Sequence, residues 1–197
     1  MFNIYKIDDK ASEIAKRIKM VVLDVDGVLT DGRLIFSQTG EELKFFHSHD
    51  GLGISLLHKA GIKTAIITGR KSQIVKLRAN ELKIKDVYQN CKNKITSLEK
   101  IMIKHKISLA EIAYIGDDIN DIGVLSVVAL PCTVLNASAE VKEIAKLVSE
   151  KDGGKGAVRE IVEYILKSQN IWDELVKSFL TQKTNQTVKK DFTGFCQ

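Results

Sequence analysis

Short apolar runs, bounded by polar residues or glycine, recur along the chain. They are continuous rather than alternating, which is typical of strands buried on both faces. The predicted strands are residues 20–25, 63–67, 112–115, 127–130 and, with a weaker pattern, 146–148. Between them, apolar residues recur three and four positions apart and predict helices over residues 52–59, 72–82, 93–105, 139–145 and 157–166. This alternation predicts an α/β fold with a parallel sheet and helices on both faces.

One segment departs from the alternation. Residues 33–37 and 41–46 flank Gln38-Thr39-Gly40, a pattern that predicts a β-hairpin directly after the first strand. Such a flap would overhang the carboxyl ends of the strands.

The C-terminal part changes in composition. Trp172, with Ile171 and Leu175, predicts an amphipathic C-terminal helix. The following residues are polar and weakly patterned, so we expect one domain over residues 1–180 and a flexible tail over residues 181–197.

Composition narrows the class of protein. With 197 residues, of which 44% are hydrophobic and 28% charged, the chain fits one globular domain and neither a disordered nor a membrane-spanning protein. The net charge of +5 permits an anionic partner, but it is spread along the chain and does not indicate nucleic acid. No signal-peptide pattern and no C-x-x-C spacing is present. We therefore expect a cytoplasmic protein without membrane contact, disulfides or a zinc site.

Acidic residues follow two of the predicted strands. Asp24 and Asp26 end the first strand at a spacing of two, which points their side chains to the same side. The strand over residues 112–115 is followed by Asp117 and Asp118, with Asn120 and Asp121 close behind. Ligands of open α/β sheets bind beyond the carboxyl ends of strands, so these acids converge at one site. Crowded carboxylates without nearby histidine or cysteine favour Mg²⁺.

A carboxylate in such a site can also react. Asp24 is placed to attack phosphorus and form an aspartyl phosphate, which water then hydrolyses. Asp26, where the chain turns, can donate a proton to the leaving alkoxide and later take one from water. The alternative is that this Asp-rich segment is only a strand-to-turn junction.

Two further segments suit a phosphoryl group. Thr68, Gly69 and Arg70 end a predicted strand, where a hydroxyl and backbone N–H groups can receive it. Lys94 opens a predicted helix and can neutralise its charge. Alternatively, Thr68 is only a helix N-cap and Lys94 only a solvated charge.

These pieces occur in the order DVDGVLTDG, IITGR, a lysine that opens a helix, and YIGDDIND. Together they resemble the four motifs of the haloacid dehalogenase-like phosphohydrolase superfamily, which has a Rossmann-like core. The resemblance implies that Asp24 is the nucleophile and Asp26 the general acid and base. It implies that the phosphoryl group is contacted by Thr68, Gly69 and Lys94. It further implies that Mg²⁺ is bound by Asp24, Asp117 and the backbone carbonyl of Asp26, and that Asp118 and Asp121 support the metal ligands.

The resemblance extends further. FHSHDGLGISLLHKAGIKTAIITGR, IGDDIND and GGKGAVREIVEYILKSQNIWDE are similar to the family of 3-deoxy-D-manno-octulosonate 8-phosphate phosphatases, in register over residues 15–175. It implies hydrolysis of that phosphate for lipopolysaccharide biosynthesis. It also implies a core without a large cap domain, and a homotetramer in which residues 33–46, the GGKG segment and C-terminal segments of neighbouring subunits close the site.

The family's sugar contacts also transfer by position. The implied substrate contacts are Asp26, His47, Ser48, His49, Asp50, Gly51, Arg70, Arg78 and Lys94. Arg70 and Arg78 are eight residues apart at a predicted helix start and would share one flank of that helix. His49 stands where the family commonly has arginine, so a permanent cation is replaced by a group that titrates near neutrality.

This interpretation has three alternatives. The first stays open: the substrate is a nonulosonate 9-phosphate or a broad range of sugar phosphates, because phosphatase modules of nonulosonic acid pathways share several of these patterns. A non-catalytic oligomerisation module is disfavoured, because Asp24, Asp26, Lys94 and Asp117 are all present. A metal site at His47 and His49 is rejected for want of a third nitrogen or sulfur ligand.

Overall fold

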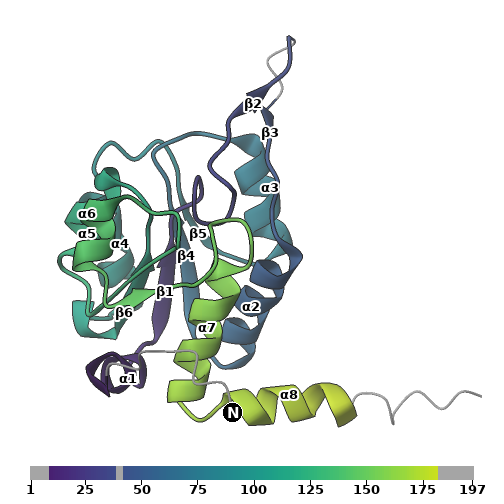
Figure 1. The fold of residues 1–197 in the computed structure, drawn as a ribbon, viewed down its shortest axis with the longest axis vertical. Coiled ribbons are helices and arrows are strands. Elements are labelled where there is room, and N and C mark those ends of the chain that lie inside the picture. Colours follow the sequence, from purple (N-terminus) through teal and green to yellow (C-terminus); the bar gives the residue numbers. More distant parts are fainter. Residues whose placement is uncertain (1–8, 39–41, 182–197) are drawn as a thin grey trace, which may run out of the picture.

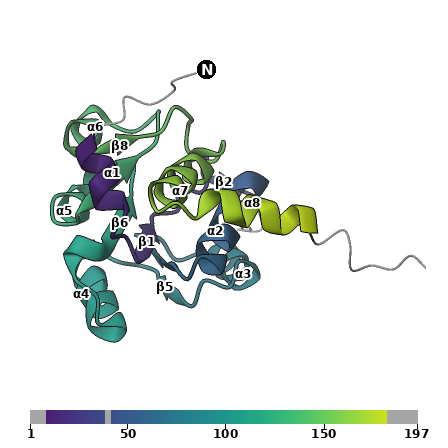
Figure 2. The same ribbon diagram turned by 90° about the horizontal axis from the view of Figure 1, so that it is seen from below.

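A six-stranded parallel sheet forms the centre of the molecule (Figures 1 and 2). The computed structural model describes residues 9–38 and 42–181. The strand order is β5-β4-β1-β6-β7-β8, and every pairing within the sheet is parallel. The strands are β1 (Met20–Leu23), β4 (Lys63–Ile67), β5 (Asp86–Tyr88), β6 (Ile112–Ile115), β7 (Leu130–Thr133) and β8 (Leu147–Val148).

The central strand β1 explains why the apolar runs are continuous. It pairs with β4 and β6, so that Leu23 lies opposite both Ile66 and Ile115. All four of its side chains are fully buried. Met20 and Val22 belong to the core on one face of the sheet, whereas its other two residues belong to the core on the opposite face. A strand covered by helices on both faces needs apolar residues at every position.

Helices cover both faces, as predicted (Figure 2). One core receives side chains from α1 (Asp9–Ala15), α2 (Ser48–Lys59), α3 (Gln73–Glu81), α7 (Ala157–Ser168) and α8 (Trp172–Thr181). The opposite core is covered mainly by α4 (Lys94–His105), α5 (Ile122–Leu125) and α6 (Ala139–Ile144). Single 3₁₀ turns, η1 (Leu109–Glu111) and η2 (Ile119–Asp121), flank β6.

The predicted hairpin is present. Strands β2 (Ile35–Phe36) and β3 (Glu42–Leu43) pair antiparallel in a separate two-stranded sheet. Figure 1 shows this hairpin projecting beyond α3, away from the main sheet. Residues 39–41 of its turn lie outside the described residues. Only a short segment separates β3 from α2, so the described chain carries the Rossmann-like core of the predicted fold class without a large cap.

Some element predictions are wrong. The strand predicted over residues 127–130 lies at Leu130–Thr133, where Pro131 weakened the sequence pattern although the segment is fully buried. The short strand β5 and the helices α1 and α5 were not predicted, since each is too short to establish a clear period. The C-terminal helix was predicted at Trp172 and is present as α8.

Two other predictions concern the ends and the membrane. The tail predicted over residues 181–197 lies outside the described residues, apart from Thr181 at the end of α8. Within the ranges that the structure describes, no helix is long and apolar enough to cross a bilayer.

Candidate active site

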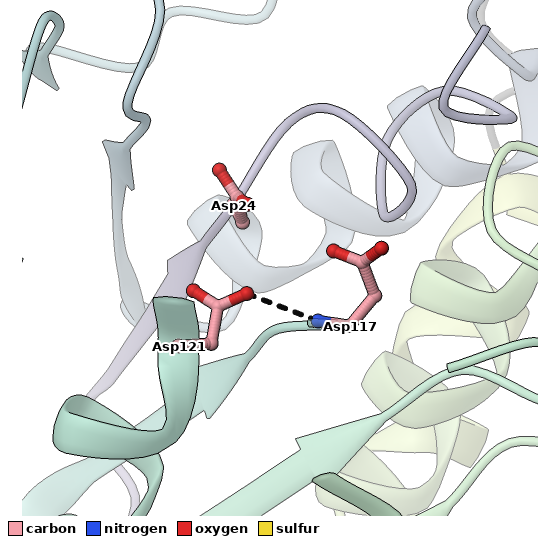
Figure 3. A group of neighbouring side chains, drawn as sticks. All are labelled: Asp24, Asp117 and Asp121. Atoms are coloured by element: carbon pink, nitrogen blue, oxygen red, sulfur yellow. Dashed lines mark hydrogen bonds between the residues drawn. The ribbon is translucent and has the colours of Figure 1, made fainter. Parts of the chain in front are cut away.

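The carboxyl ends of β1 and β6 bring three acids together. Asp24 directly follows β1, and its N–H donates to Ile115 O at 3.0 Å. Asp117 follows β6, and Asp121 ends the η2 turn. One carboxylate oxygen from each acid lies within 4.8 Å of the others (Figure 3). Adjacent parallel strands place their following loops at the same edge of the sheet, and this proximity results from that topology.

Asp121 is the most enclosed member of the cluster. Its side chain is fully buried and accepts hydrogen bonds from the Tyr114 hydroxyl and from Lys94 Nζ, the latter at 2.6 Å. Its second oxygen accepts from the N–H of Asp117 at 3.1 Å and of Asp118 at 3.4 Å. Asp121 therefore orients the loop that carries Asp117.

Lys94 forms ion pairs with two of the three acids, Asp24 after β1 and Asp121 after β6. Its Nζ lies 2.8 Å from Asp24 Oδ2 and 2.6 Å from Asp121 Oδ1, and only 4% of its side chain is exposed. Burial lowers the pKa of Lys94, but the charges of Asp24 and Asp121 outweigh burial and hold that pKa above its usual value. Lys94 is thus a buried cation of the site, and its interpretation as a solvated surface charge is wrong.

The electrostatics of the cluster favour a cation. Burial, then the charge of Asp121, raises the pKa of Asp24 to about 6. Burial, then the charge of Asp24, raises the pKa of Asp117 to about 7. Asp24 Oδ1 is buried and has no hydrogen-bond partner among the described residues. An unpartnered carboxylate oxygen beside two further carboxylates fits Mg²⁺, a hard cation that prefers oxygen ligands.

Gly27 allows the loop after β1 to close over this cluster. Its φ is +87°, and a Cβ at this position would overlap the carboxylate of Asp117. Any other residue would both strain the backbone and displace that acid. The DVDG segment is therefore a tight turn and part of the acidic site at the same time.

Asp26 lies in the same loop. Its side chain is 20% exposed and accepts a hydrogen bond from Lys44 Nζ of the hairpin segment. Its Oδ2 lies 3.8 Å from Arg70 Nε, and the Arg70 guanidinium stacks 5.8 Å from the centroid of the Phe36 ring.

The predicted phosphoryl contacts lie at the end of β4, the neighbour of β1. Thr68 is buried, and its N–H donates to Tyr88 O at 2.9 Å. Gly69 follows it and is exposed. The N-cap of α3 is Ser72, whose Oγ accepts from Val75 N–H at 3.4 Å, so the interpretation of Thr68 as that cap is wrong.

The segment predicted to contact the sugar forms the start of α2. His47 is the N-cap, and its ring nitrogen accepts from the His49 N–H at 3.2 Å. Ser48 and His49 are exposed. The two histidines therefore lie at the start of a helix.

Asp50 and Gly51, also in the first turn of α2, contact the neighbouring helices α7 and α3. Asp50 is 1% exposed, and its Oδ1 accepts from the Arg159 N–H in the first turn of α7 at 2.8 Å. Burial raises the pKa of Asp50. Gly51 packs against the guanidinium of Arg78.

The two arginines do not share a helix. Helix α3 begins at Gln73, so Arg70 precedes it and only Arg78 belongs to it. The prediction of a shared helical flank is wrong, because Ser72 caps the helix after Arg70. Arg70 lies beside Asp26, whereas Arg78 pairs with Glu81 at 2.8 Å and faces the Phe46 ring at 5.5 Å.

The remaining predicted support residue is Asp118. Its exposed side chain accepts from Ile119 N–H at 2.8 Å and caps the η2 turn. It contacts Asp121 through its backbone N–H.

Sequence reasoning did not identify Tyr114 and Lys44. Tyr114 lies inside an apolar strand, where an aromatic residue is ordinarily part of the core. Lys44 lies in the segment ELKF, residues 42–45, whose polar and apolar residues alternate. That alternation is typical of a strand with two different faces but does not say which face meets the site.

Comparison with known proteins agrees with the geometry. The haloacid dehalogenase-like hydrolase family matches residues 80–162, a range that contains Lys94, Asp117 and Asp121. The 3-deoxy-D-manno-octulosonate 8-phosphate phosphatase of Escherichia coli (strain K12) is 39% identical over 160 residues, which are 81% of this chain and 85% of the relative. That of Yersinia pestis is 37% identical over 164 residues, 83% of this chain and 88% of the relative.

Solved structures show the same relationship. The 3-deoxy-D-manno-octulosonate 8-phosphate phosphatase of Moraxella catarrhalis was solved in complex with magnesium, phosphate and the sugar acid. It superposes on this chain with a TM-score of 0.85 and 40% sequence identity, and the match covers 87% of this chain and 99% of that chain. The cobalt-bound phosphatase from Haemophilus influenzae gives a TM-score of 0.80 and 37% identity, covering 85% and 99%.

The parallel sheet, the small hairpin and the acids at the ends of β1 and β6 define a haloacid dehalogenase-like hydrolase without a large cap domain. Within this class, the chain belongs to the family of 3-deoxy-D-manno-octulosonate 8-phosphate phosphatases.

Proposed function

We propose that this protein hydrolyses 3-deoxy-D-manno-octulosonate 8-phosphate to the free sugar acid and phosphate, for use in lipopolysaccharide biosynthesis. The relatives that carry this name support the substrate. The observation that carries the chemistry is Asp24, whose Oδ1 is buried and unpartnered among the described residues while Lys94 holds Oδ2. One oxygen is thereby fixed and the other is available to react.

The first step is transfer of the phosphoryl group to the enzyme. Asp24 attacks phosphorus, the bond between phosphorus and the sugar oxygen breaks, and Asp26 donates a proton to that leaving oxygen. Thr68, the Gly69 N–H and Lys94 contact the phosphoryl oxygens and stabilise the negative charge that develops on them.

The second step releases phosphate. Asp26, now deprotonated, takes a proton from a water molecule, whose oxygen attacks phosphorus. The bond between phosphorus and Asp24 breaks, and both carboxylates return to their starting states. Asp24, Asp117 and the backbone carbonyl of Asp26 would hold Mg²⁺, which when bound polarises the phosphoryl oxygens and offsets the charge of the acids.

The sugar end of the substrate is assigned to the start of α2 and to nearby cations. The proposed contacts are His47, Ser48, His49, Asp50, Gly51, Arg70 and Arg78. His49 stands where arginine is common in the family, so the sugar carboxylate would meet an imidazole in place of a guanidinium.

We also propose a cytoplasmic homotetramer in which neighbouring subunits close the site. The hairpin supports this proposal, because it exposes apolar side chains that water solvates poorly: Phe36 is 57% exposed, Leu43 54% and Phe45 62%. We further propose a single domain over residues 1–180.

A substrate panel tests the function. Phosphate release is measured from the octulosonate 8-phosphate, a nonulosonate 9-phosphate and p-nitrophenyl phosphate, each with Mg²⁺ and with EDTA. We expect kcat/KM for the octulosonate ester to exceed the others by at least about tenfold, about 1.4 kcal/mol in the transition state, and to depend on Mg²⁺. Preference for the nine-carbon ester would replace the substrate, and cleavage of the aryl ester alone would remove the sugar assignment.

Two variants control the assay. Asp24→Asn should lower kcat by at least about 10⁴-fold, because it removes the nucleophile while keeping the shape of the side chain. Asp173→Asn, at an exposed position of α8, should retain wild-type turnover. Substantial turnover by Asp24→Asn would refute the nucleophile assignment, and absence of turnover in the wild type would favour a non-catalytic module.

A further inference from the structure

Lys44 is a buried cation beside Asp26, and the proposed reaction assigns it no role. It directly follows β3, and only 1% of its side chain is exposed. Its Nζ donates to Asp26 Oδ1 and lies 3.1 Å from Glu42 Oε1. An ammonium group that has left water requires charged partners, and these two carboxylates provide them.

Glu42 connects the same segment to the main fold. Its Oε2 accepts a hydrogen bond from the Oγ of Ser72, the N-cap of α3. The Ser72 backbone is itself held by Gln89, which accepts from the Ser72 N–H at 2.7 Å and donates to Ser72 O at 3.0 Å. The base of the hairpin is therefore fixed at two points, Asp26 through Lys44 and α3 through Glu42.

The two cations beside Asp26 differ in how closely they hold it. Lys44 is enclosed and bonds Oδ1 directly, whereas Arg70 is 44% exposed and lies 3.8 Å from Oδ2. Lys44 therefore sets the orientation of the carboxylate. The 20% exposure of Asp26 leaves part of that group open to a ligand.

We propose that Lys44 is a positioning residue, which holds the Asp26 carboxylate in the orientation that proton exchange with the leaving oxygen and with water requires. This inference rests on the proposed role of Asp26 as general acid and base. Proton transfer needs donor and acceptor atoms about 2.6–3.2 Å apart, so a carboxylate free to rotate spends less time in the productive geometry. Because Lys44 is enclosed by two carboxylates, it acts through Asp26 and not on the substrate.

Steady-state kinetics with the octulosonate 8-phosphate and Mg²⁺ test this role. Lys44→Met keeps the length of the side chain and removes its charge. It should lower kcat by about tenfold to a hundredfold, with KM unchanged within about threefold. Lys44→Arg retains the charge and the donors and should restore part of the loss. Lys100→Met, at an exposed position of α4, should match the wild type.

A double-mutant cycle separates positioning from simple anchoring of the hairpin. In an Asp26→Asn background, Lys44→Met should lower kcat by no more than about twofold, because no acid or base remains to be oriented. An equal loss in both backgrounds would show that Lys44 only anchors the hairpin. A rise in KM with unchanged kcat would make Lys44 a substrate contact, which also overturns the proposal.

The same experiment distinguishes the two levels of inference. A wild-type protein without turnover contradicts the proposed function itself. A wild type that turns over, with Lys44→Met equal to it in kcat, contradicts only the role of Lys44. Thermal unfolding is recorded for every variant, and Lys44→Gln, which keeps a donor of shorter reach, replaces Lys44→Met in the cycle if that variant does not fold.

Discussion

At the scale of the residue, acids on one edge of the sheet differ in what surrounds them. Asp121 is fully buried with both oxygens engaged, so it orients its neighbours. Asp24 keeps one oxygen without a partner among the described residues, so it can react or bind a cation. Asp26 is partly exposed and held by Lys44, which suits exchange of a proton with a ligand. Local hydrogen bonding thus gives chemically identical side chains different roles.

Backbone approach matters at the same scale. The Gly153 backbone lies so close to that of Gly27 that a Cβ on Gly153 would overlap the Gly27 carbonyl. The following N–H, of Gly154, donates to Val28 O at 2.9 Å. The GGKG segment, which the family resemblance assigns to contacts between subunits, therefore first packs against the loop that carries Asp26 within its own chain.

Gly153→Ala should therefore displace this loop. We expect the free energy of unfolding to fall by about 1–3 kcal/mol in urea titrations, the usual cost of overpacking, and kcat/KM to fall as well. Gly123→Ala is the matched control, because its Cβ would meet only Ile95 at an ordinary distance of 3.6 Å. Equal stability of the two variants would contradict the predicted overlap.

At the scale of the element, β3 and the residues after it invert the usual distribution of polarity. Leu43 and Phe45 face outward, whereas the intervening Lys44 is enclosed. A strand that turns its charged face to the site and its apolar face to solvent is suited to two tasks, contact with Asp26 and contact with another subunit.

Helices α2 and α7 show a second connection between elements. Asp50, in the first turn of α2, accepts from the backbone N–H of Arg159 in the first turn of α7, and thus satisfies a donor that has no partner within its helix. The two helices pack side by side in Figure 1. Asp50 consequently holds the start of α2 against α7.

Asp50→Ala should lower the free energy of unfolding by about 1–2 kcal/mol without any ligand, because it removes this capping interaction. Urea denaturation of the metal-free protein measures the change. Asp173→Ala, an exposed acid on α8, should change stability by less than about 0.5 kcal/mol. If Asp50→Ala altered only KM, the residue would be a substrate contact without a structural role.

At the scale of the whole molecule, the acidic edge couples stability to pH and to metal. In the folded protein the pKa of Asp24 is raised to about 6 and that of Asp117 to about 7, both above the usual value of 3.8. At pH values between the usual pKa of 3.8 and these raised values, the two carboxyl groups hold protons in the folded state that they have released in the unfolded state. Their contribution to stability is therefore largest below about pH 4 and is lost as the pH rises to about 7.

Mg²⁺ should offset that loss. We expect it to raise the Tm of the metal-free protein more at pH 8 than at pH 5, because protons compete for the same carboxylates. At a concentration of one hundred times Kd the stabilisation is about 2.7 kcal/mol. Differential scanning calorimetry at matched ionic strength, with NaCl as the control salt, measures the shift. Asp117→Asn should reduce the rise in Tm that Mg²⁺ causes. A rise that is larger at pH 5 than at pH 8 would contradict binding of Mg²⁺ by these carboxylates.

The exposed hairpin predicts association. Sedimentation velocity should show a homotetramer for the wild type, and the double variant Phe36→Ser/Phe45→Ser should sediment as smaller species with a raised KM. Ile103→Ser, which changes a 78% exposed apolar residue on α4, should remain a tetramer. A monomeric, fully active wild type would remove the need for neighbouring subunits.

The alternation of buried strands with helices and the positions of Asp24, Lys94 and Asp117 at element ends were predictable from the sequence, because burial on both faces imposes continuous apolar runs and strand ends mark where ligands bind. The position of β7 was not, since Pro131 obscured it, nor was the side chain that caps α3, which is that of Ser72 and not that of Thr68. Short elements carry too few residues for a period to decide.

The sequence by itself determined the fold class, the acidic motifs and the family, because these depend on patterns local to each segment. Only the tertiary structure decided how the acids differ and which residues support them. Tyr114 and Lys44 reach Asp121 and Asp26 from positions seven and eighteen residues away along the chain. Such contacts depend on which loops the packed elements bring to one edge, and no local pattern contains that information.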